Sequence, residues 1–546
     1  MQFGPIKSPF QQIAIHALAA GLLCLALNGV VTVNAVGIEK TRTRAQQALR
    51  SGDFQRAEQL YRELLAKNDR DTDARLGLSH ALLKQRRLQD SFDHAARVAA
   101  VDPLSARAHS LLGSAVLASG DFRLSVEEFR RALSLNSDEA MAIAGLAMID
   151  YYENRTAKCV AGLRRAAFID PNEPDYLFNL GQAAARIERY KEAADAYERF
   201  LVVAPRTDSD RRARIRGLID FLHYLGQQNA LYNLQGPDRT VLQFEAPDGR
   251  PIIKLRINGS KEFLRFVLDT GSGMSVISDE TARKLGVKPV AQGGLARAVG
   301  GGGRFQIVYG CLNAIDVGEV RIANVPVYIR HFYDEHNPVD GYLGIAALSR
   351  LLVSLDYGVR TLTLTRQRNF QMELGTATAG QGKPVKAEAV EPRPEIGVPV
   401  RMTSSGFLSG EVLIEGIAKP LNFIIDTGAT VSVLSEKTAA LDEARAFIKE
   451  GRMRVFGAAG IAEDVKTALL PKVMMGSYTL ERINAAVLDL EPVNETAGFQ
   501  QSGILGGNFL RHFRVAFDFQ KSIVRLQPLD AAPIQSASPQ PEGTKE

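Results

Sequence analysis

The pattern of hydrophobic and polar positions repeats every 34 residues between residues 41 and 208. The turn Ser51-Gly-Asp-Phe54 returns two periods later as Ser119-Gly-Asp-Phe122. Six residues after the start of each of these two turns, and at the same place in the three other repeats, comes a small side chain; the five residues are Ala57, Ser91, Ser125, Cys159 and Ala193. Because small residues let two helices approach closely, this spacing predicts helix pairs stacked into a solenoid.

Three prolines fall in step with this repeat, at Pro103, Pro171 and Pro205, where each is expected to close the second helix of a unit. The pattern resembles five tetratricopeptide repeats. The resemblance implies an all-α solenoid over residues 41–235, with a capping helix over roughly 211–225. It also implies a surface that binds a peptide or a protein partner and has no chemistry of its own. The alternative is that the array only spaces or stabilises the rest of the chain.

From Gly236 onward the pattern is that of short β-strands. The run 251–257 leads into Asn258-Gly259, a strong hairpin signal, and residues 261–268 return as a strand that delivers Asp269. Further along, residues 411–425 predict the same hairpin again, with its turn near Glu415-Gly416.

Two copies of one thirteen-residue stretch, at 266–278 and 423–435, organise this half of the chain. Seven positions are identical, and each copy carries an aspartate from an apolar run into a tight Thr-Gly turn. The similarity continues downstream, where Tyr342-Leu-Gly344 corresponds to Ile504-Leu-Gly506. A single Asp-Thr-Gly is an ordinary turn. The extended duplication, however, predicts two successive domains of one design.

The duplicated motif resembles that of the retropepsin-like aspartic peptidases. The resemblance implies two all-β domains, over residues 240–370 and 395–530. In this family each domain supplies one catalytic aspartate, and two domains make one active site. The matching positions in this chain are Asp269 and Asp426.

Further residues match the loops and flaps of the same family. The resemblance implies that threonine hydroxyls cross between the domains and brace the loops, while glycines permit the turns. These supporting residues are Thr270, Gly271, Thr427 and Gly428. Each domain also has a glycine-bearing stretch that matches a hairpin flap, which closes over an extended peptide and excludes water. The candidate flap glycines are Gly300, Gly301, Gly302, Gly303, Gly457 and Gly460.

Two carboxylates about 3 Å apart cannot both stay ionised. The pair therefore holds one shared proton, as aspartic proteases illustrate. The resemblance therefore predicts an aspartic-type endopeptidase. The ionised carboxylate would take a proton from water, while its protonated partner would donate to the peptide carbonyl. This chemistry uses no metal and no cofactor. The covalent link between the domains favours an intrachain pseudo-dimer of Asp269 with Asp426. Two separate homodimeric sites are the alternative.

One departure from symmetry stands out, since Ser272-Gly273 follows the first turn and Ala429-Thr430 follows the second. The main alternative function is a non-catalytic peptide- or protein-binding scaffold built from retired peptidase domains. A scaffold whose Asp loops are only structural turns is a third interpretation. An active enzyme retains both aspartates, both Thr-Gly pairs and both flaps, as this chain does.

Composition narrows the remaining function classes. The 546 residues predict several domains, and the net charge of +5 does not by itself suggest nucleic acid. Three cysteines lie far apart, with neither metal-ligand spacing nor a disulfide framework. A bridge between Cys159 and Cys311 stays open. Because Cys159 falls at a small-residue packing position, we expect a buried structural thiol there.

The remaining segments are predicted from composition. Residues 1–36, with Lys7 ahead of an apolar run, resemble a signal peptide or membrane anchor, so we expect an exported, periplasmic or membrane-anchored protein. A cut after Ala35 fits this pattern. Residues 371–394 are expected to be a flexible linker, and residues 531–546 a disordered tail.

Overall fold

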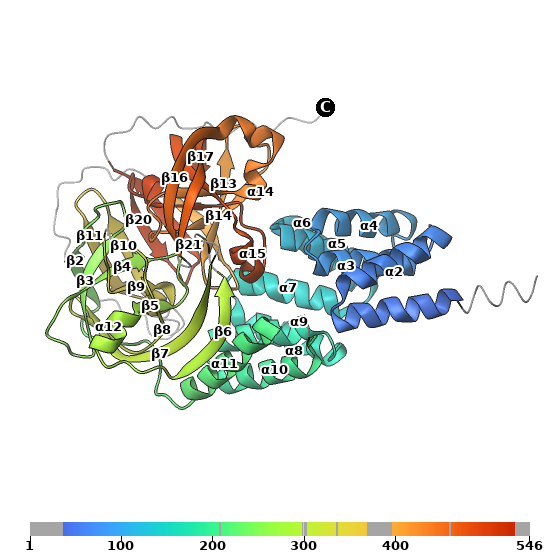
Figure 1. Ribbon diagram of the computed structural model, residues 1–546, viewed down its shortest axis with the longest axis horizontal. Coiled ribbons are helices and arrows are strands. Elements are labelled where there is room, and N and C mark those ends of the chain that lie inside the picture. The colour runs from blue at the N-terminus through green and yellow to red at the C-terminus, as the bar shows by residue number, and fades with distance from the viewer. Residues whose placement is uncertain are drawn as a thin grey trace, which may run out of the picture. The chain divides into compact units, whose positions relative to one another are not determined.

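Helices precede strands along the chain in the computed structural model (Figure 1). The structure describes residues 37–206, 209–297, 299, 303–334, 337–367, 396–457 and 460–529. The predicted N-terminal segment, linker and tail (1–36, 371–394 and 531–546) lie outside these residues and stay predictions. Within the described ranges, no helix has both the length and the apolar character needed to cross a bilayer.

The N-terminal part is a succession of helices of similar length, which begins with residues 37–51. The helices that follow are α2 (Phe54–Lys67), α3 (Thr72–Lys84), α4 (Leu88–Val101), α5 (Ala106–Ser119), α6 (Phe122–Leu135), α7 (Ala140–Tyr152), α8 (Thr156–Ile169), α9 (Pro174–Arg186), α10 (Tyr190–Val203) and α11 (Ser209–Leu225). The predicted fold class, a helical repeat array followed by a β-rich region, is confirmed.

Small residues pack where the 34-residue spacing placed them. None of the five has any exposed surface: Ala57, Ser91, Ser125, Cys159 and Ala193. Gly77 of α3 shows the same close approach, because a Cβ there would lie 2.3 Å from the ring of Tyr61 in α2. Side-chain volume at these positions therefore sets how closely the helices pack.

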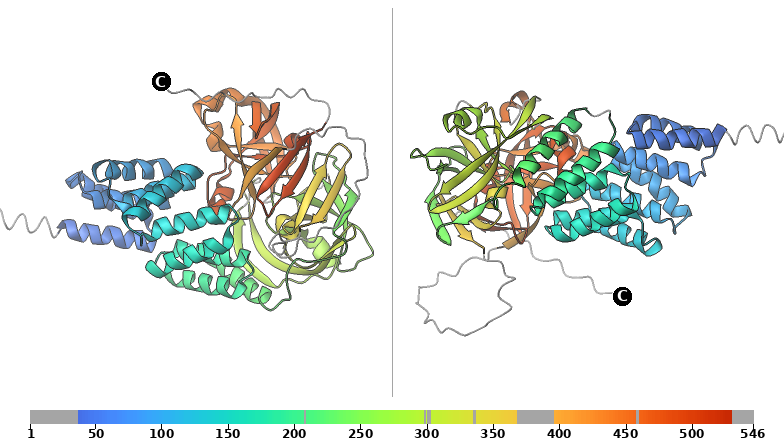
Figure 2. Two further views of the ribbon diagram at one scale, coloured as in Figure 1. Left: turned by 180° about the vertical axis from the view of Figure 1, so that it is seen from behind. Right: turned by 90° about the horizontal axis from the view of Figure 1, so that it is seen from below.

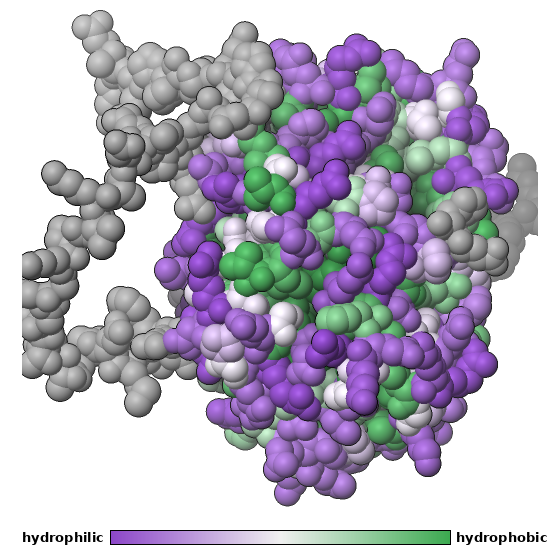
Figure 3. Space-filling view, turned by 90° about the vertical axis from the view of Figure 1, so that its left-hand side faces the viewer, coloured by the Kyte–Doolittle hydropathy of each residue, from purple (hydrophilic) through white to green (hydrophobic). Residues whose placement is uncertain are grey.

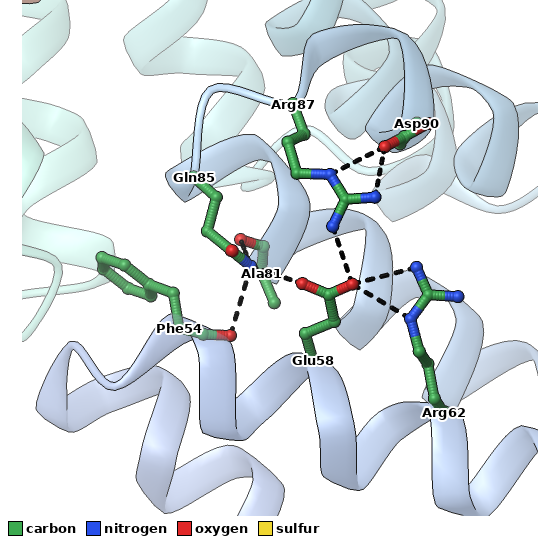
Figure 4. Close-up of polar contacts among 7 residues, drawn as sticks. All are labelled: Phe54, Glu58, Arg62, Ala81, Gln85, Arg87 and Asp90. Atoms are coloured by element: carbon green, nitrogen blue, oxygen red, sulfur yellow. Dashed lines mark hydrogen bonds and ion pairs between the residues drawn. The ribbon is translucent and has the colours of Figure 1, made fainter.

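A polar cluster joins α2 to the turn between α3 and α4, the next helix pair (Figure 4). The carboxylate of Glu58 accepts hydrogen bonds from Arg62, Gln85 and Arg87, at 3.0, 3.0 and 2.8 Å. Burial alone would raise the pKa of Glu58, but these three donors lower it overall. The repeats are thus held by charge-assisted hydrogen bonds as well as by apolar packing.

The described chain divides into two compact units, and the boundary falls within the helical array. The second unit contains residues 117–122, 143–203 and 209–529. Helices α8 to α11 therefore share one compact unit with all the strands. This grouping has a functional consequence, because these helices lie beside the candidate site described below.

Eight strands of the first β domain form a sheet of order β1-β8-β5-β9-β4-β3-β7-β6, while its β2, β10 and β11 belong to the second sheet. Its strands are β1 (Asn233–Gln235), β2 (Arg239–Gln243), β3 (Ile252–Ile257), β4 (Leu264–Asp269), β5 (Ser275–Ser278), β6 (Ala291–Arg297), β7 (Arg304–Val317), β8 (Val320–Arg330), β9 (Gly341–Gly344), β10 (Leu351–Asp356) and β11 (Thr361–Arg366). Its short helices are α12 (Asp279–Lys284) and α13 (Ile345–Leu348).

The second β domain repeats this design. Its strands are β12 (Ile396–Met402), β13 (Leu408–Ile414), β14 (Leu421–Ile425), β15 (Ser432–Ser435), β16 (Ile448–Gly457), β17 (Gly460–Met475), β18 (Tyr478–Leu488), β19 (Gly503–Leu505), β20 (Phe513–Asp518) and β21 (Ile523–Pro528). Its helices are α14 (Glu436–Ala439), η2 (Asp442–Phe447), α15 (Glu491–Ala497) and α16 (Gly507–Leu510). The two domains, green to yellow and orange to red, lie side by side in Figure 2.

One continuous sheet joins the two domains, because β10 pairs antiparallel with β20. Ser354 lies opposite Ala516, and these residues occupy equivalent positions in the two copies. The flanking pairs are Val353 with Phe517 and Leu355 with Val515. The residue before Ser354 in one strand therefore pairs with the residue after Ala516 in the other, and the reverse also holds. This pattern marks a local two-fold axis between the domains at the Ser354–Ala516 pair.

The main hydrophobic core spans both β domains and includes Phe266, Phe423, Phe509 and Phe517. The face drawn in Figure 3 carries mostly hydrophilic residues, between which hydrophobic ones show through. Because Phe266 belongs to β4 and Phe423 to β14, each aspartate is carried by a strand that packs into this apolar core.

Candidate active site

Both aspartates stand where a central strand ends. Asp269 closes β4, which pairs in parallel with β9, and Asp426 directly follows β14, which pairs in parallel with β19. The structure brings the two loops together. A Cβ on Gly271 would lie 2.4 Å from the carboxyl carbon of Asp426, and one on Gly428 would lie 2.5 Å from Oδ1 of Asp269. Neither glycine can carry a side chain without displacing the carboxyl group of the other domain.

The threonines of the two turns exchange hydrogen bonds between the domains. Thr270 Oγ1 donates to the carbonyl of Ile425 at 2.7 Å, and Thr427 Oγ1 donates to the carbonyl of Leu268 at 2.6 Å. Each hydroxyl also accepts the backbone N–H of the other threonine, at 3.1 and 3.0 Å. Both side chains are fully buried. Because unpaired buried polar groups are costly, these four bonds hold the loops in one arrangement.

The two carboxyl groups have different hydrogen-bond partners. The N–H of Gly271 donates to Oδ1 of Asp269 at 2.8 Å, and the hydroxyl of Ser272 donates to Oδ2 at 2.5 Å. Asp426 instead accepts two backbone N–H groups on the same oxygen, from Gly428 at 2.7 Å and from Ala429 at 3.2 Å. The departure from symmetry in the sequence therefore acts directly on the aspartates.

These partners separate the proton affinities of the pair. Burial raises the pKa of Asp426 well above its usual value, and the neighbouring charge of Asp269 raises it further. Burial also raises the pKa of Asp269, but hydrogen bonds from Ser272, Asp426 and Gly271 oppose that rise, as does the charge of Arg330. The arrangement favours an ionised Asp269 beside a protonated Asp426.

The aspartates lie in a cavity of about 1180 Å³. Residues of both flap hairpins line it, including Phe305 of β7 and Phe456 of β16. Helices of the repeat array line it too, through Tyr151, Tyr197 and Phe221 of α7, α10 and α11. All of these residues belong to the second compact unit. The wall formed by the helices was not predicted, because nothing local in the sequence shows which helices would face a strand domain.

The glycine-bearing stretches lie at the ends of two long hairpins. Gly303 directly precedes β7, Gly457 ends β16 and Gly460 begins β17. Of these three, Gly457 lines the cavity. The other candidate flap residues, Gly300, Gly301 and Gly302, lie outside the described residues.

Helix α11 braces the first hairpin, as its position beside β6 in Figure 1 shows. A Cβ on Gly217 would lie 2.2 Å from the carbonyl oxygen of Gln292, so helix and strand approach closely. Arg214 donates to the carbonyl of Leu295 at 2.7 Å. The sequence predicts a flap in each domain, and the structure fixes the first of them to the capping helix α11.

The described cysteines are unbridged, and their exposure and surroundings differ. Cys159 is a buried free thiol, and Cys311 is a free thiol of intermediate exposure, so no bridge joins them. Burial raises the pKa of Cys159 to about 12, which makes it inert at neutral pH. The described ranges contain no group of three or more His, Cys, Asp or Glu side chains placed to hold a metal ion.

Comparison with protein families supports the same two-part architecture. Residues 253–347 and 410–509 match the aspartyl protease family. Residues 48–115, 93–140 and 151–210 match tetratricopeptide repeat families, whose members form protein-interaction surfaces. The suspected combination of a retropepsin-like aspartyl protease domain in two segments with N-terminal tetratricopeptide repeats is thereby confirmed. No curated protein sequence matches the chain.

Solved structures resemble the chain over about a third of its length. A thermophilic tetratricopeptide-repeat protein of Thermus thermophilus is 19% identical, with a TM-score of 0.29, covering 33% of this chain and 98% of its own. MamA from Desulfovibrio magneticus is 20% identical, with a TM-score of 0.23 and coverage of 32% and 97%. The Cut9–Hcn1 hetero-tetramer of the APC/C is 13% identical, with a TM-score of 0.30 and coverage of 35% and 37%.

Proposed function

We propose that this chain, in which tetratricopeptide repeats precede two aspartyl protease segments, is an aspartic-type endopeptidase. Asp269 and Asp426 are its catalytic pair. The observation that carries this proposal is the reciprocal contact of the two loops, in which Gly271 lies against Asp426 and Gly428 against Asp269. It places two buried carboxyl groups with different proton affinities in one cavity.

In the proposed reaction, Asp269 acts as the base and Asp426 as the acid. Water gives a proton to Asp269, and its oxygen bonds to the carbonyl carbon of the peptide. Asp426 donates its hydrogen to the carbonyl oxygen, where negative charge develops. The C–N bond then breaks as Asp269 returns its proton to the leaving amine, while one hydroxyl of the tetrahedral intermediate gives its proton back to Asp426 and becomes the carbonyl of the acid. The products are a carboxylic acid and an amine, and both aspartates end in their starting charge states.

We propose that this pair is intrachain, as a pseudo-dimer of the two β domains. The threonine bonds between Thr270 and Thr427 and the shared sheet of β10 and β20 support it. Linking two halves in one chain also raises the effective concentration of one half for the other. The substrate would lie extended between the flaps and the aspartates.

The test is peptide cleavage by purified protein, with a mixed peptide library and a pepstatin-type inhibitor. We expect cleavage that the inhibitor blocks and that Asp269→Asn or Asp426→Asn removes. Asp442→Asn is the matched control, because this carboxylate is 83% exposed and pairs with nearby Arg445 on the surface. A well-folded wild-type protein that binds peptides but cleaves none would favour the retired-peptidase scaffold.

We also propose that the repeats recruit the substrate or its carrier protein. Phe168 of α8 supports this, because its side chain is 86% exposed on a repeat helix. A photoreactive residue at position 168 of the Asp426→Asn protein should crosslink to a bound protein substrate. Val359, 65% exposed at a β-turn, is the control position. Equal crosslinking at both positions would argue against recruitment by the repeats.

Export remains a proposal that rests on residues 1–36 alone, and the alternatives are a cleaved, periplasmic form and a membrane-anchored form. Cell fractionation followed by sequencing of the mature N-terminus separates them. Full-length protein that stays soluble in the cytoplasm would contradict both.

A further inference from the structure

The cavity contains a partly buried cation that has no direct ion-pair or hydrogen-bond partner among the described residues. Arg330 ends β8 and lines the cavity with Asp269. Its Nε is buried without a hydrogen-bond partner. Within the described ranges, no ion pair or hydrogen bond reaches its guanidinium; its close neighbours are the rings of Phe305 and Phe332, at 5.2 and 5.9 Å.

Other cavity arginines have partners, which sets Arg330 apart. Arg250 pairs with Asp334 at 3.1 Å, and Arg350 pairs with Glu188 at 2.6 Å. Arg186 donates to the carbonyl of Thr403 at 2.8 Å. A guanidinium that is partly removed from water without a hydrogen-bonded counter-ion is costly, so such a group marks a place where an anion can bind.

The second domain shows what occupies the equivalent place there. Arg330 lies opposite Ser278 in the pairing of β5 with β8, and Leu488 lies opposite Ser435 in the pairing of β15 with β18. Ser278 and Ser435 are the closing residues of the two thirteen-residue copies. Arg330 and Leu488 are therefore equivalent, and both line the cavity.

A second pair of equivalent positions has the same polarity difference. Tyr342 lies opposite Val267 in β4, and Ile504 lies opposite Ile424 in β14. Leu488 and Ile504 belong to one buried apolar cluster in the second domain. Tyr342 is instead close enough to Arg330 and Asp269 for their charges to act on it. The cavity thus has a polar, cationic half and an apolar half.

Resting on the proposed peptidase function, we infer that Arg330 binds a substrate carboxylate beside the scissile bond. The enzyme therefore selects peptides with an acidic side chain on the first-domain side of that bond and an apolar one on the other. A carboxylate accepts two parallel hydrogen bonds from a guanidinium, which neither a neutral amide nor an apolar side chain can match. Arg330 is a specificity residue in this role, while Asp269 and Asp426 carry out the reaction.

The test compares the cleavage of peptides that differ in a single side chain. In these peptides, each of the three positions on either side of a cleaved bond carries Glu, Gln or Leu in turn, and both ends are blocked. The assay is run at about pH 6, where the glutamate side chain is ionised. At one position we expect kcat/KM for Glu to exceed that for Gln roughly ten- to hundredfold, as a charge-assisted hydrogen bond allows. A parallel set with Gln at that position and a free C-terminus shows whether a terminal carboxylate can replace the side chain.

Variants then assign the preference to one residue. Arg330→Leu, which copies the second domain, should bring the Glu/Gln ratio near one. Arg330→Lys keeps the charge but loses the planar fork, so an intermediate ratio is expected. Leu488→Arg should create an acidic preference at a position on the other side of the bond. Arg321→Leu is the control on the same strand, because Arg321 pairs with Asp316, and neither residue is among those that line the cavity.

Several outcomes would overturn the inference without touching the proposed function. One is cleavage with a Glu/Gln ratio near one at every position. Another is a ratio that Arg330→Leu leaves unchanged while the pH profile shifts, because Arg330 would then only tune Asp269. If no peptide is cleaved, the proposed function fails instead. Binding of Glu and Gln peptides to Asp426→Asn protein then decides: an equal Kd for both refutes carboxylate recognition, and a preference lost in Arg330→Leu supports it.

Discussion

The hydroxyls of Thr270 and Thr427 each accept the backbone N–H of the other residue, so the two Asp loops are joined by a reciprocal pair of hydrogen bonds. The same hydroxyls donate to main-chain carbonyls of the opposite domain. Each threonine therefore satisfies one buried acceptor and one buried donor that belong to the other half of the site.

Removing one of these hydroxyls should lower the stability of the β domains. Thr270→Val leaves the carbonyl of Ile425 and the N–H of Thr427 buried without their partner. The expected loss in free energy of unfolding is about 2–6 kcal/mol, since each of the two unsatisfied groups costs about 1–3 kcal/mol. Denaturant unfolding measures it. Thr270→Ser keeps the hydroxyl and loses only a methyl group, so it should cost about 1 kcal/mol or less; an equal loss in both variants would show that the hydroxyl is not what stabilises the paired loops.

The pH profile should respond in opposite directions to a swap of Ser272 and Ala429. Activity requires ionised Asp269, so it falls as pH decreases through the pKa of that residue. Ser272→Ala removes a hydrogen bond that lowers this pKa, and the acid limb of kcat/KM should therefore shift to higher pH. Ala429→Ser adds a donor near Asp426, whose proton must stay on; its pKa should fall, and the alkaline limb should shift to lower pH. If neither limb of the pH profile shifts in either variant, the proposed roles of Asp269 as base and Asp426 as acid are contradicted.

Either aspartate alone should be insufficient. Asp269→Asn and Asp426→Asn should each reduce kcat by at least about a hundredfold, because the general base or the general acid is lost. Mixing the two inactive proteins should not restore cleavage, since each intrachain site lacks one carboxyl group. Recovery on mixing, or substantial activity in one single variant, would instead point to sites formed between chains.

The brace between α11 and the first hairpin should be separable from the catalytic pair. Gly217→Val forces a side chain against the backbone of Gln292, so we expect faster amide hydrogen exchange in residues 291–297 and a raised KM. The second hairpin, residues 448–475, should keep its exchange rate. Gly226→Ala is the control, because a Cβ there meets its nearest neighbour at an ordinary 3.4 Å. Unchanged exchange in both variants would show that the brace does not hold the flap.

Several features of the site followed from sequence alone because they depend on local chemistry. Gly271 and Gly428 stand in turns that an Asp-Thr-Gly tripeptide forms by itself, and the duplication paired Asp269 with Asp426. Ser272 opposite Ala429 signalled asymmetry, but its direction required the hydrogen bond to Asp269. Arg330 gave no signal, since an arginine at the end of a strand is usually a solvated charge.

The sequence by itself determined the helical repeats and the two Asp-Thr-Gly hairpins. Helix period and turn preference act within a few residues and leave their mark on each stretch separately. Only the tertiary structure decided that β10 pairs with β20, that α11 lies against the first flap, and that Arg330 and Asp269 line one cavity together with repeat helices. These arrangements join residues far apart in the chain, where the packing of whole elements, and no local pattern, selects the partner.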